Sequence, residues 1–217
     1  MMEAAERRLR QEIIDVCLRM SEVGINQGTS GNVSVRHGDG ILITPSGIAY
    51  EQLVPEDIVA MDFDGTATGK YAASSEWRFH LDILKARPDL NAVVHAHPIY
   101  STAIAICREE IPAVHYMIAG AGGPTIRCAP YATYGTRELS EHALAALEGR
   151  NACLLANHGL IAGGPSLAKA LWLAVEIETL AHQLTVARQF GKPVVLGDDE
   201  IAVVVEKFKS YGLKEKD

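Results

Sequence analysis

The chain has 217 residues and a formal net charge of −7, and this length suits one full-sized α/β domain. The acidic balance and the scattered basic residues argue against nucleic-acid binding, which needs a clustered basic surface. The stretch from Met1 to Met20 lacks the apolar core of a signal peptide, and no window approaches the roughly 18 apolar residues of a membrane span. We therefore expect a cytoplasmic protein with neither a nucleic-acid partner nor a membrane partner.

Hydrophobic spacing predicts the elements of the first half of the chain. Apolar residues at helical spacing from Leu9 to Val23 indicate a helix that stops at Gly24. A glycine-rich loop then leads into short strands, and a second helix ends at Pro88 because proline cannot continue it. The strands are expected at 33–36, 41–44, 58–63 and 92–97, and the second helix at 76–87.

The second half of the chain alternates between predicted helices and strands. Helices are expected at 101–108, 138–147, 166–190, with Ser166 as the N-cap, and about 199–211. Short strands are expected at 113–118, 125–128 and 153–156. No repeat or linker interrupts this order, so we expect one α/β domain over 1–217, with a mixed sheet flanked by helices on both faces.

Two histidines one residue apart, His95 and His97, lie in the predicted buried strand 92–97. Alternate side chains of a strand share one face, so both imidazoles can reach one metal ion. A lone strand histidine is more often a hydrogen-bonded core residue, but two adjacent buried imidazoles without a shared partner would be costly. His158, beside Gly159, and Glu76, at a predicted helix start, are further candidate ligands. Imidazoles with a carboxylate favour a catalytic zinc site, because structural zinc recruits thiolates.

Hydroxyl and glycine groups suggest an anion site close to this cluster. Ser74 and Ser75 precede the predicted helix that starts at Glu76, and the free backbone N–H groups of a helix start bind anions. The loops 28–32 and 44–47 offer similar donors, and each alone would be interpreted as a turn. Together they predict a phosphate cradle. It is not a nucleotide loop, since no glycine motif has the required spacing. His80 faces the same way as Glu76, although packing explains it adequately.

Five segments closely resemble the class II aldolase and sugar-phosphate epimerase family. They are 26–35, 44–47, 74–76, 94–97 and 157–159. Four further segments are similar to the branch of that family that cleaves L-fuculose 1-phosphate, namely 115–119, 128–139, 170–174 and 200–212. The likeness runs from the first helix to the last, and it implies a single-domain class II aldolase fold with a central mixed, largely antiparallel sheet.

The resemblance also implies roles for individual residues. His95, His97 and His158 would hold one divalent metal, zinc first with manganese or cobalt as alternatives. Glu76 would complete the resting coordination and then act as general acid/base. The substrate phosphate would be bound by Gly31, Asn32, Ser46, Gly47, Ser74 and Ser75. Ser46 stands where the family pattern has threonine, which keeps the hydroxyl.

Three tyrosines are implied at the aldehyde end of the site. Tyr116 would serve the aldehyde oxygen across a subunit boundary, since relatives form cyclic tetramers with interfacial sites. Tyr211 matches a tyrosine that closes over the site. Tyr134 stands where the fuculose branch has phenylalanine, and it adds a polar group beside the sugar tail. The homotetramer and the identity of the aldehyde are therefore expectations from the family.

The implied reaction is cleavage of a ketose 1-phosphate between C3 and C4, giving dihydroxyacetone phosphate and an aldehyde, with the metal as Lewis acid. L-Fuculose 1-phosphate, which yields L-lactaldehyde, is the leading substrate. The alternative is 5-deoxyribulose 1-phosphate or 5-methylthioribulose 1-phosphate, in the salvage of S-adenosylmethionine by-products. A sugar-phosphate 4-epimerase and a non-catalytic scaffold such as the adducin head domain are weaker readings, because the Tyr116 segment and the four ligands favour the aldolase.

Overall fold

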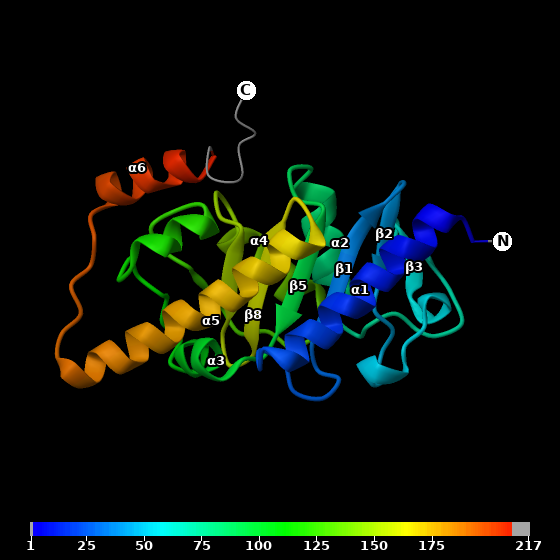
Figure 1. The fold of residues 1–217 in the computed structure, drawn as a ribbon, viewed down its shortest axis with the longest axis horizontal. Helices are drawn as coiled ribbons and strands as arrows, with labels where there is room; N and C mark the ends of the chain where they lie inside the picture. Colours follow the sequence, from blue (N-terminus) through cyan, green and yellow to red (C-terminus); the bar gives the residue numbers. More distant parts are fainter. Residues whose placement is uncertain (1, 210–217) are drawn as a thin grey trace, which may run out of the picture.

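The computed structural model describes residues 2–209 and is built on one eight-stranded sheet (Figure 1). The strand order is β4-β3-β2-β1-β5-β8-β7-β6, and every neighbouring pair is antiparallel except β6 with β7. The strands are β1 (Asn32–His37), β2 (Gly40–Ile43), β3 (Val59–Asp62), β4 (Ala67–Thr68), β5 (Ala92–Ala96), β6 (Cys128–Ala129), β7 (Ala152–Leu155) and β8 (Gly159–Gly164). This confirms the mixed, largely antiparallel sheet.

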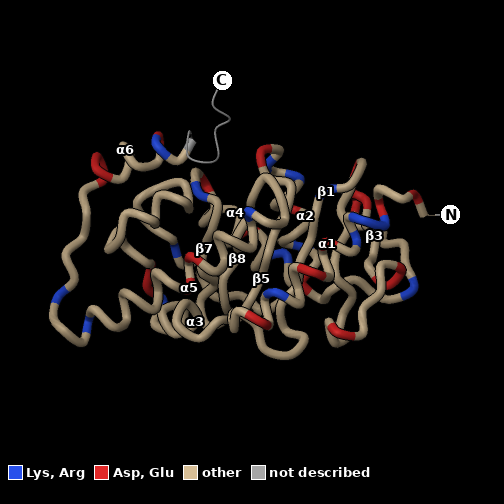
Figure 2. Tube along the Cα trace, in the orientation of Figure 1, with Lys and Arg blue, Asp and Glu red and all other residues tan. Residues whose placement is uncertain are grey.

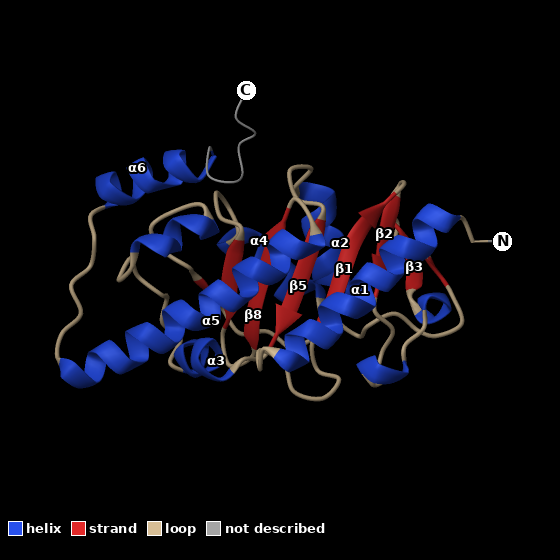
Figure 3. Cartoon of the chain, in the orientation of Figure 1, coloured by secondary structure: helices blue, strands red, loops and turns tan. Residues whose placement is uncertain are grey.

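Helices cover both faces of the sheet, as Figure 3 shows. One face packs on α1 (Ala4–Glu22), α3 (Ile99–Ile106) and α5 (Leu167–Phe190), and the other packs on α2 (Trp77–Ala86) and α4 (Arg137–Ala146). The last helix, α6 (Asp198–Lys209), contacts the 3-10 helix η3 (Tyr116–Ala121). Two further 3-10 helices are η1 (Tyr50–Gln52) and η2 (Pro55–Asp57). None of the described helices is long and apolar enough to span a membrane.

Strand β5 lies in the middle of the sheet and divides its side chains between two cores. Val94 and Ala96 belong to the core under α1 and α5, whereas Val93 belongs to the core under α2 and α4. His95 points to the second side, where the ring of Phe79 meets it edge-on at 5.2 Å between centroids. The strand therefore carries a polar ligand at its carboxyl end without interrupting either core.

Two predicted strands differ from the structure. Residues 113–118 do not form a strand. They lead instead into η3, whose start is capped by the His115 ring accepting a hydrogen bond from Met117 N at 3.3 Å. This local cap overrides the β propensity of the segment. Of 125–128, only Cys128 enters a strand, and Ile126 forms an isolated bridge with Ile111.

Strand β8 was not predicted, because its sequence carries three glycines and no alternation. Two of those glycines permit close packing that a side chain would block. A Cβ on Gly163 would lie 2.7 Å from Leu90 Cδ1, and one on Gly164 would lie 2.6 Å from Ala170 N. Basic and acidic residues intermix along the trace (Figure 2), as the scattered pattern in the sequence suggested.

Candidate active site

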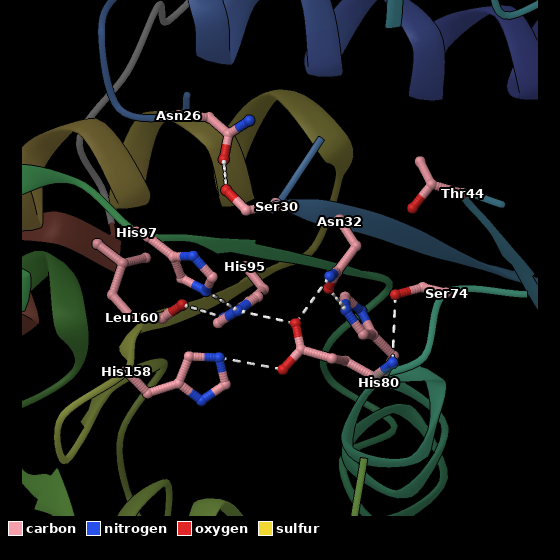
Figure 4. Close-up of polar contacts among 12 residues, drawn as sticks. Asn26, Ser30, Asn32, Thr44, Ser74, His80, His95, His97, His158 and Leu160 are labelled. Atoms are coloured by element: carbon pink, nitrogen blue, oxygen red, sulfur yellow. Dashed lines mark hydrogen bonds and ion pairs between the residues drawn. The ribbon is translucent and has the colours of Figure 1, made fainter. Parts of the chain in front are cut away.

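Four side chains converge at the carboxyl end of β5 (Figure 4). His95 is the penultimate residue of β5 and His97 follows the strand, Glu76 precedes α2, and His158 lies in the turn between β7 and β8. The Nε2 atoms of His95 and His97 are 2.8 Å apart. Glu76 Oε2 lies 3.1 Å from His95 Nε2, and its Oε1 lies 3.1 Å from His158 Nε2. One ligand atom from each residue fits within a 4.8 Å cluster, so the structure brings the four predicted ligands together.

The hydrogen-bond acceptors of this cluster converge in a way that suits a bound cation. His95 Nδ1 donates to the backbone carbonyl of Leu160 at 2.8 Å, which leaves the Nε2 lone pair of the neutral ring facing the cluster. That lone pair meets His97 Nε2 at 2.8 Å and a carboxylate oxygen of Glu76 at 3.1 Å, and the carboxylate oxygen is itself an acceptor. Glu76 Oε1 is buried and has no hydrogen-bond partner among the described residues, although His158 is close. A divalent metal would satisfy these converging acceptors, so the residues present fit one.

Burial and mutual charge set the protonation states of the cluster. Burial of the Glu76 carboxyl alone would raise its pKa, but the neighbouring imidazoles of His95 and His158 hold that pKa well below its usual range. Burial, reinforced by the charges of the other two histidines, lowers the pKa of His97 to about 3. At neutral pH the site therefore presents an ionised carboxylate and a neutral imidazole, which are the forms that bind metal.

The turn that carries His158 has two special backbone positions. Asn157 has φ 55°, in the left-handed region that asparagine tolerates, and its N–H donates to Ala105 O at 3.1 Å. Gly159 follows, and a Cβ there would lie 2.6 Å from His97 Cδ2 and would collide with the Ala96 carbonyl. Glycine at position 159 permits this close approach of β5 and its histidine.

A buried hydrogen-bond network supports Glu76 from the side of the sheet. Asn32 Nδ2 donates to Glu76 Oε2 at 3.0 Å, and Asn32 Oδ1 lies 2.5 Å from His80 Nε2. His80 Nδ1 in turn lies 2.7 Å from the hydroxyl of Ser34. His80 was interpreted from sequence as a packing residue, and Ser34 was not singled out. The sequence signal for His80 was the helical spacing that puts it one turn beyond Glu76.

The loops of the expected phosphate cradle lie side by side. Ser46 N donates to Ala72 O at 3.1 Å, and Ser74 N donates to Thr44 O at 2.9 Å, so the segment before α2 pairs with the loop that follows β2. The hydroxyl of Ser74 accepts a hydrogen bond from Glu76 N at 3.3 Å. Of the six predicted residues, three are exposed and three are buried. The exposed residues are Ser46, Gly47 and Ser75, and the buried ones are Gly31, Asn32 and Ser74.

Tyr50 fixes the glycine-rich loop ahead of Asn32, a function that sequence reasoning missed. Its hydroxyl donates to Gly31 O at 2.5 Å, and the Asn26 side chain donates to the same hydroxyl at 3.3 Å. Burial raises the pKa of Tyr50 well above its usual range, so it remains a donor. A Cβ on Gly31 would lie 2.5 Å from Asn26 Oδ1, which explains glycine at this crowded position.

A cavity of about 320 Å³ opens directly over the cluster. It is lined by Glu76, His97 and His158 together with Ser75, Tyr131, Ala132, Tyr134 and Asn157. Tyr134 therefore lies at the mouth of the metal cavity, and its side chain is exposed. Tyr131, which the sequence did not single out, lies beside it.

Tyr116 lies apart from this cavity within one chain. It lines a separate cavity of about 470 Å³ between η3, α5 and α6, with Met117, Trp172 and Phe208 among its neighbours. The Tyr116 side chain is 51% exposed. A role for Tyr116 at the metal therefore requires a second copy of the chain. Tyr211 lies outside the described residues.

Comparison with known proteins agrees with this architecture. Residues 11–185 match the model of the class II aldolase and adducin N-terminal domain. L-Fuculose phosphate aldolase of Escherichia coli (strain K12) is 56% identical over 208 residues, which is 95% of this chain and 97% of that protein. The 5-methylthioribulose-1-phosphate/5-deoxyribulose-1-phosphate aldolase of Rhodospirillum rubrum is 54% identical over 204 residues, 94% of this chain and 92% of that protein. A solved L-fuculose 1-phosphate aldolase superposes with a TM-score of 0.92 at 43% identity, covering 96% of this chain and 98% of that one.

The chain belongs to the class II aldolase family. It is an aldolase, a carbon–carbon lyase, and its fold and its cluster of one glutamate and three histidines are those expected of a metal-dependent enzyme. Its similar relatives divide between fuculose phosphate and methylthioribulose or deoxyribulose phosphate cleavage. The family and the cluster of ligands therefore define the class of enzyme.

Proposed function

We propose that this enzyme cleaves L-fuculose 1-phosphate between C3 and C4 to dihydroxyacetone phosphate and L-lactaldehyde. The observation that carries this proposal is the Glu76, His95, His97 and His158 cluster beneath one cavity, in a chain 56% identical along its length to a fuculose phosphate aldolase. We also propose zinc as the native metal, a domain that extends over 1–217 and a cytoplasmic location.

The proposed mechanism assigns one task to each part of the site. The bound metal would supply Lewis-acid stabilisation for the negative charge that develops on the three-carbon phosphate fragment. Gly31, Asn32 and Ser74, with the exposed Ser46, Gly47 and Ser75, would hold the substrate phosphate and so fix the reacting carbons, which can contribute several kcal/mol. As the C3–C4 bond breaks, Tyr116 of a neighbouring subunit would take the proton of the C4 hydroxyl, and Glu76 would deliver the proton to C3 that releases dihydroxyacetone phosphate.

The 54% identical relative supports a second candidate, cleavage of 5-methylthioribulose or 5-deoxyribulose 1-phosphate. These ketoses share the phosphate end with L-fuculose 1-phosphate and differ at the tail, which the cavity presents to Tyr131 and Tyr134. A steady-state comparison of the three ketose phosphates separates the candidates. We expect the highest kcat/KM for L-fuculose 1-phosphate, and a large preference for either of the others would replace our assignment.

We further propose a homotetramer in which Tyr116 of one subunit serves the site of its neighbour, closed by Tyr211. The separation of Tyr116 from the metal cavity supports this arrangement. Subunit mixing tests it, because Glu76→Gln and Tyr116→Ala would each be inactive alone. Mixed oligomers would regain activity at sites that combine an intact Glu76 with an intact Tyr116. If activity does not recover after subunit exchange has been verified, Glu76 and Tyr116 of one site belong to the same chain.

A further inference from the structure

Behind Glu76 lies a buried hydrogen-bond relay made of Asn32, His80 and Ser34. Its hydrogen bonds have one consistent direction from donor to acceptor. Ser34 and His80 are fully buried, and Asn32 is only 4% exposed. An ionised carboxylate only accepts hydrogen bonds, so the amide NH2 of Asn32 must face Glu76 Oε2. The amide carbonyl then faces His80 Nε2 at 2.5 Å, and that nitrogen must carry a proton.

The same logic continues to Ser34. No carboxylate among the described residues makes an ion pair or hydrogen bond with the His80 ring, and a charged imidazole without a counter-ion is disfavoured in a dry core. A neutral ring protonated at Nε2 has a lone pair at Nδ1, so the Ser34 hydroxyl donates to it at 2.7 Å. Ser34 thus stabilises the His80 tautomer that the Asn32 carbonyl requires, and His80 in turn holds that carbonyl in place.

We propose that Ser34 and His80 are positioning residues which, through Asn32, keep Glu76 Oε2 as a fixed hydrogen-bond acceptor and leave Oε1 as the oxygen that carries the transferred proton. Oε1 is the buried oxygen without a hydrogen-bond partner in the described part of the chain. This inference rests on the proposed acid/base function of Glu76. The direction of the hydrogen bonds from Ser34 through His80 and Asn32 to Glu76 does not depend on which reaction the site performs.

Losing the Nε2–H donor would remove one of the two hydrogen bonds that hold the Asn32 amide. With an apolar residue at position 80, the amide carbonyl is left buried without a donor, so Asn32 is held less firmly against Glu76. Substitution of groups that orient a metal site from behind typically costs about 10–100-fold in activity or metal affinity. We expect His80→Leu to lower kcat in this range with KM changed by less than about threefold, since the other phosphate-binding residues are untouched.

Conservative and control variants separate positioning from packing. In His80→Gln, an amide nitrogen can replace Nε2 as donor to Asn32, so we expect it to recover most of the kcat lost in His80→Leu. Ser34→Ala removes only the hydroxyl that donates to His80 Nδ1, and we expect a smaller loss of kcat than in His80→Leu. The matched control is Ser140→Ala, which removes another fully buried serine, one that donates to Asp82 Oδ2 at 2.6 Å on the α2–α4 contact. It should lower the melting temperature without lowering kcat.

The decisive readout does not depend on activity. In metal-free protein, the nitrogen-15 shifts of the His80 ring report its tautomer, and we expect a proton on Nε2 and none on Nδ1. A proton on His80 Nδ1 in the unsubstituted protein would overturn the proposed hydrogen-bond direction. If the tautomer is as expected but His80→Leu keeps full kcat, the positioning of Glu76 is refuted. If Glu76→Gln is itself active, the proton-carrying function fails while the hydrogen-bond direction stands.

Discussion

Gly159 offers the sharpest test of how the fold shapes the metal cluster. A Cβ added there would lie 2.6 Å from His97 Cδ2 and closer still to the Ala96 carbonyl. Ordinary carbon–carbon contact is about 3.6 Å, so a group must move by roughly 1 Å. The carbonyl belongs to the β5–β8 pairing, in which Ala96 faces Leu160, and it resists displacement. We therefore expect Gly159→Ala to displace the His97 ring.

The size of the effect follows from that displacement. A shift of about 1 Å in a catalytic group can cost about 100-fold in rate, and overpacking costs about 1–3 kcal/mol of stability. Gly163→Ala is the matched control on the same strand, because its Cβ would lie 2.7 Å from the flexible end of Leu90, away from the ligands. Both variants should lose stability in denaturant titrations, and only Gly159→Ala should lose kcat and zinc affinity in chelator competition. Wild-type zinc affinity and kcat in folded Gly159→Ala would refute this reasoning.

Two further predictions concern the carboxylate and the buried histidines. Glu76→Gln should bind substrate yet lose turnover by about 100-fold or more. The control is Glu141→Gln, at an exposed ion pair with Arg137, which should keep its turnover. Near-normal steady-state turnover in Glu76→Gln would show that Glu76 is not the acid/base. Metal-free protein should lose stability on acidification from about pH 6.5, where unfolded histidines titrate, toward pH 3. Burial, followed by the charge of His95, lowers the pKa of His80 to about 3, and burial lowers that of His97 to about 3 as well. In this window the folded state binds fewer protons than the unfolded chain, so the unfolding free energy falls as the pH falls. Urea titrations at several pH values measure this slope, which should be shallower in His80→Gln; a flat profile would contradict it.

The metal ligands were predictable because each one leaves a local signal. His95 and His97 alternate on a buried strand, and Glu76 follows two serines at a helix start, where the structure places it immediately before α2. His158 carried a weaker signal, its place just past a predicted strand and beside Gly159. The family resemblance strengthened it, since no local pattern relates residues about 60 positions apart. The structure supplies the reason, because β5 and β8 are neighbours in the sheet.

The parts that sequence could not predict depend on tertiary contacts. Strand β8 is rich in glycine and lacks alternation, so only its place between β5 and β7 makes it a strand. The segment 113–118 has strand-forming residues but is capped by His115 and packed under α6. Ser34, His80 and Tyr50 support the site through hydrogen bonds between distant segments. Only His80 has a local signal, its place one helical turn beyond Glu76.

The central claim is that the glutamate and three histidines form the metal site of a ketose 1-phosphate aldolase. It is tested most directly by measuring dihydroxyacetone phosphate release from L-fuculose 1-phosphate, before metal is stripped, after stripping verified by elemental analysis, and after zinc is restored. We predict release by the loaded protein, none by the stripped protein and recovery with about one zinc per subunit. An unchanged rate after stripping, or no release from any of the three ketose phosphates by the loaded protein, would contradict the account.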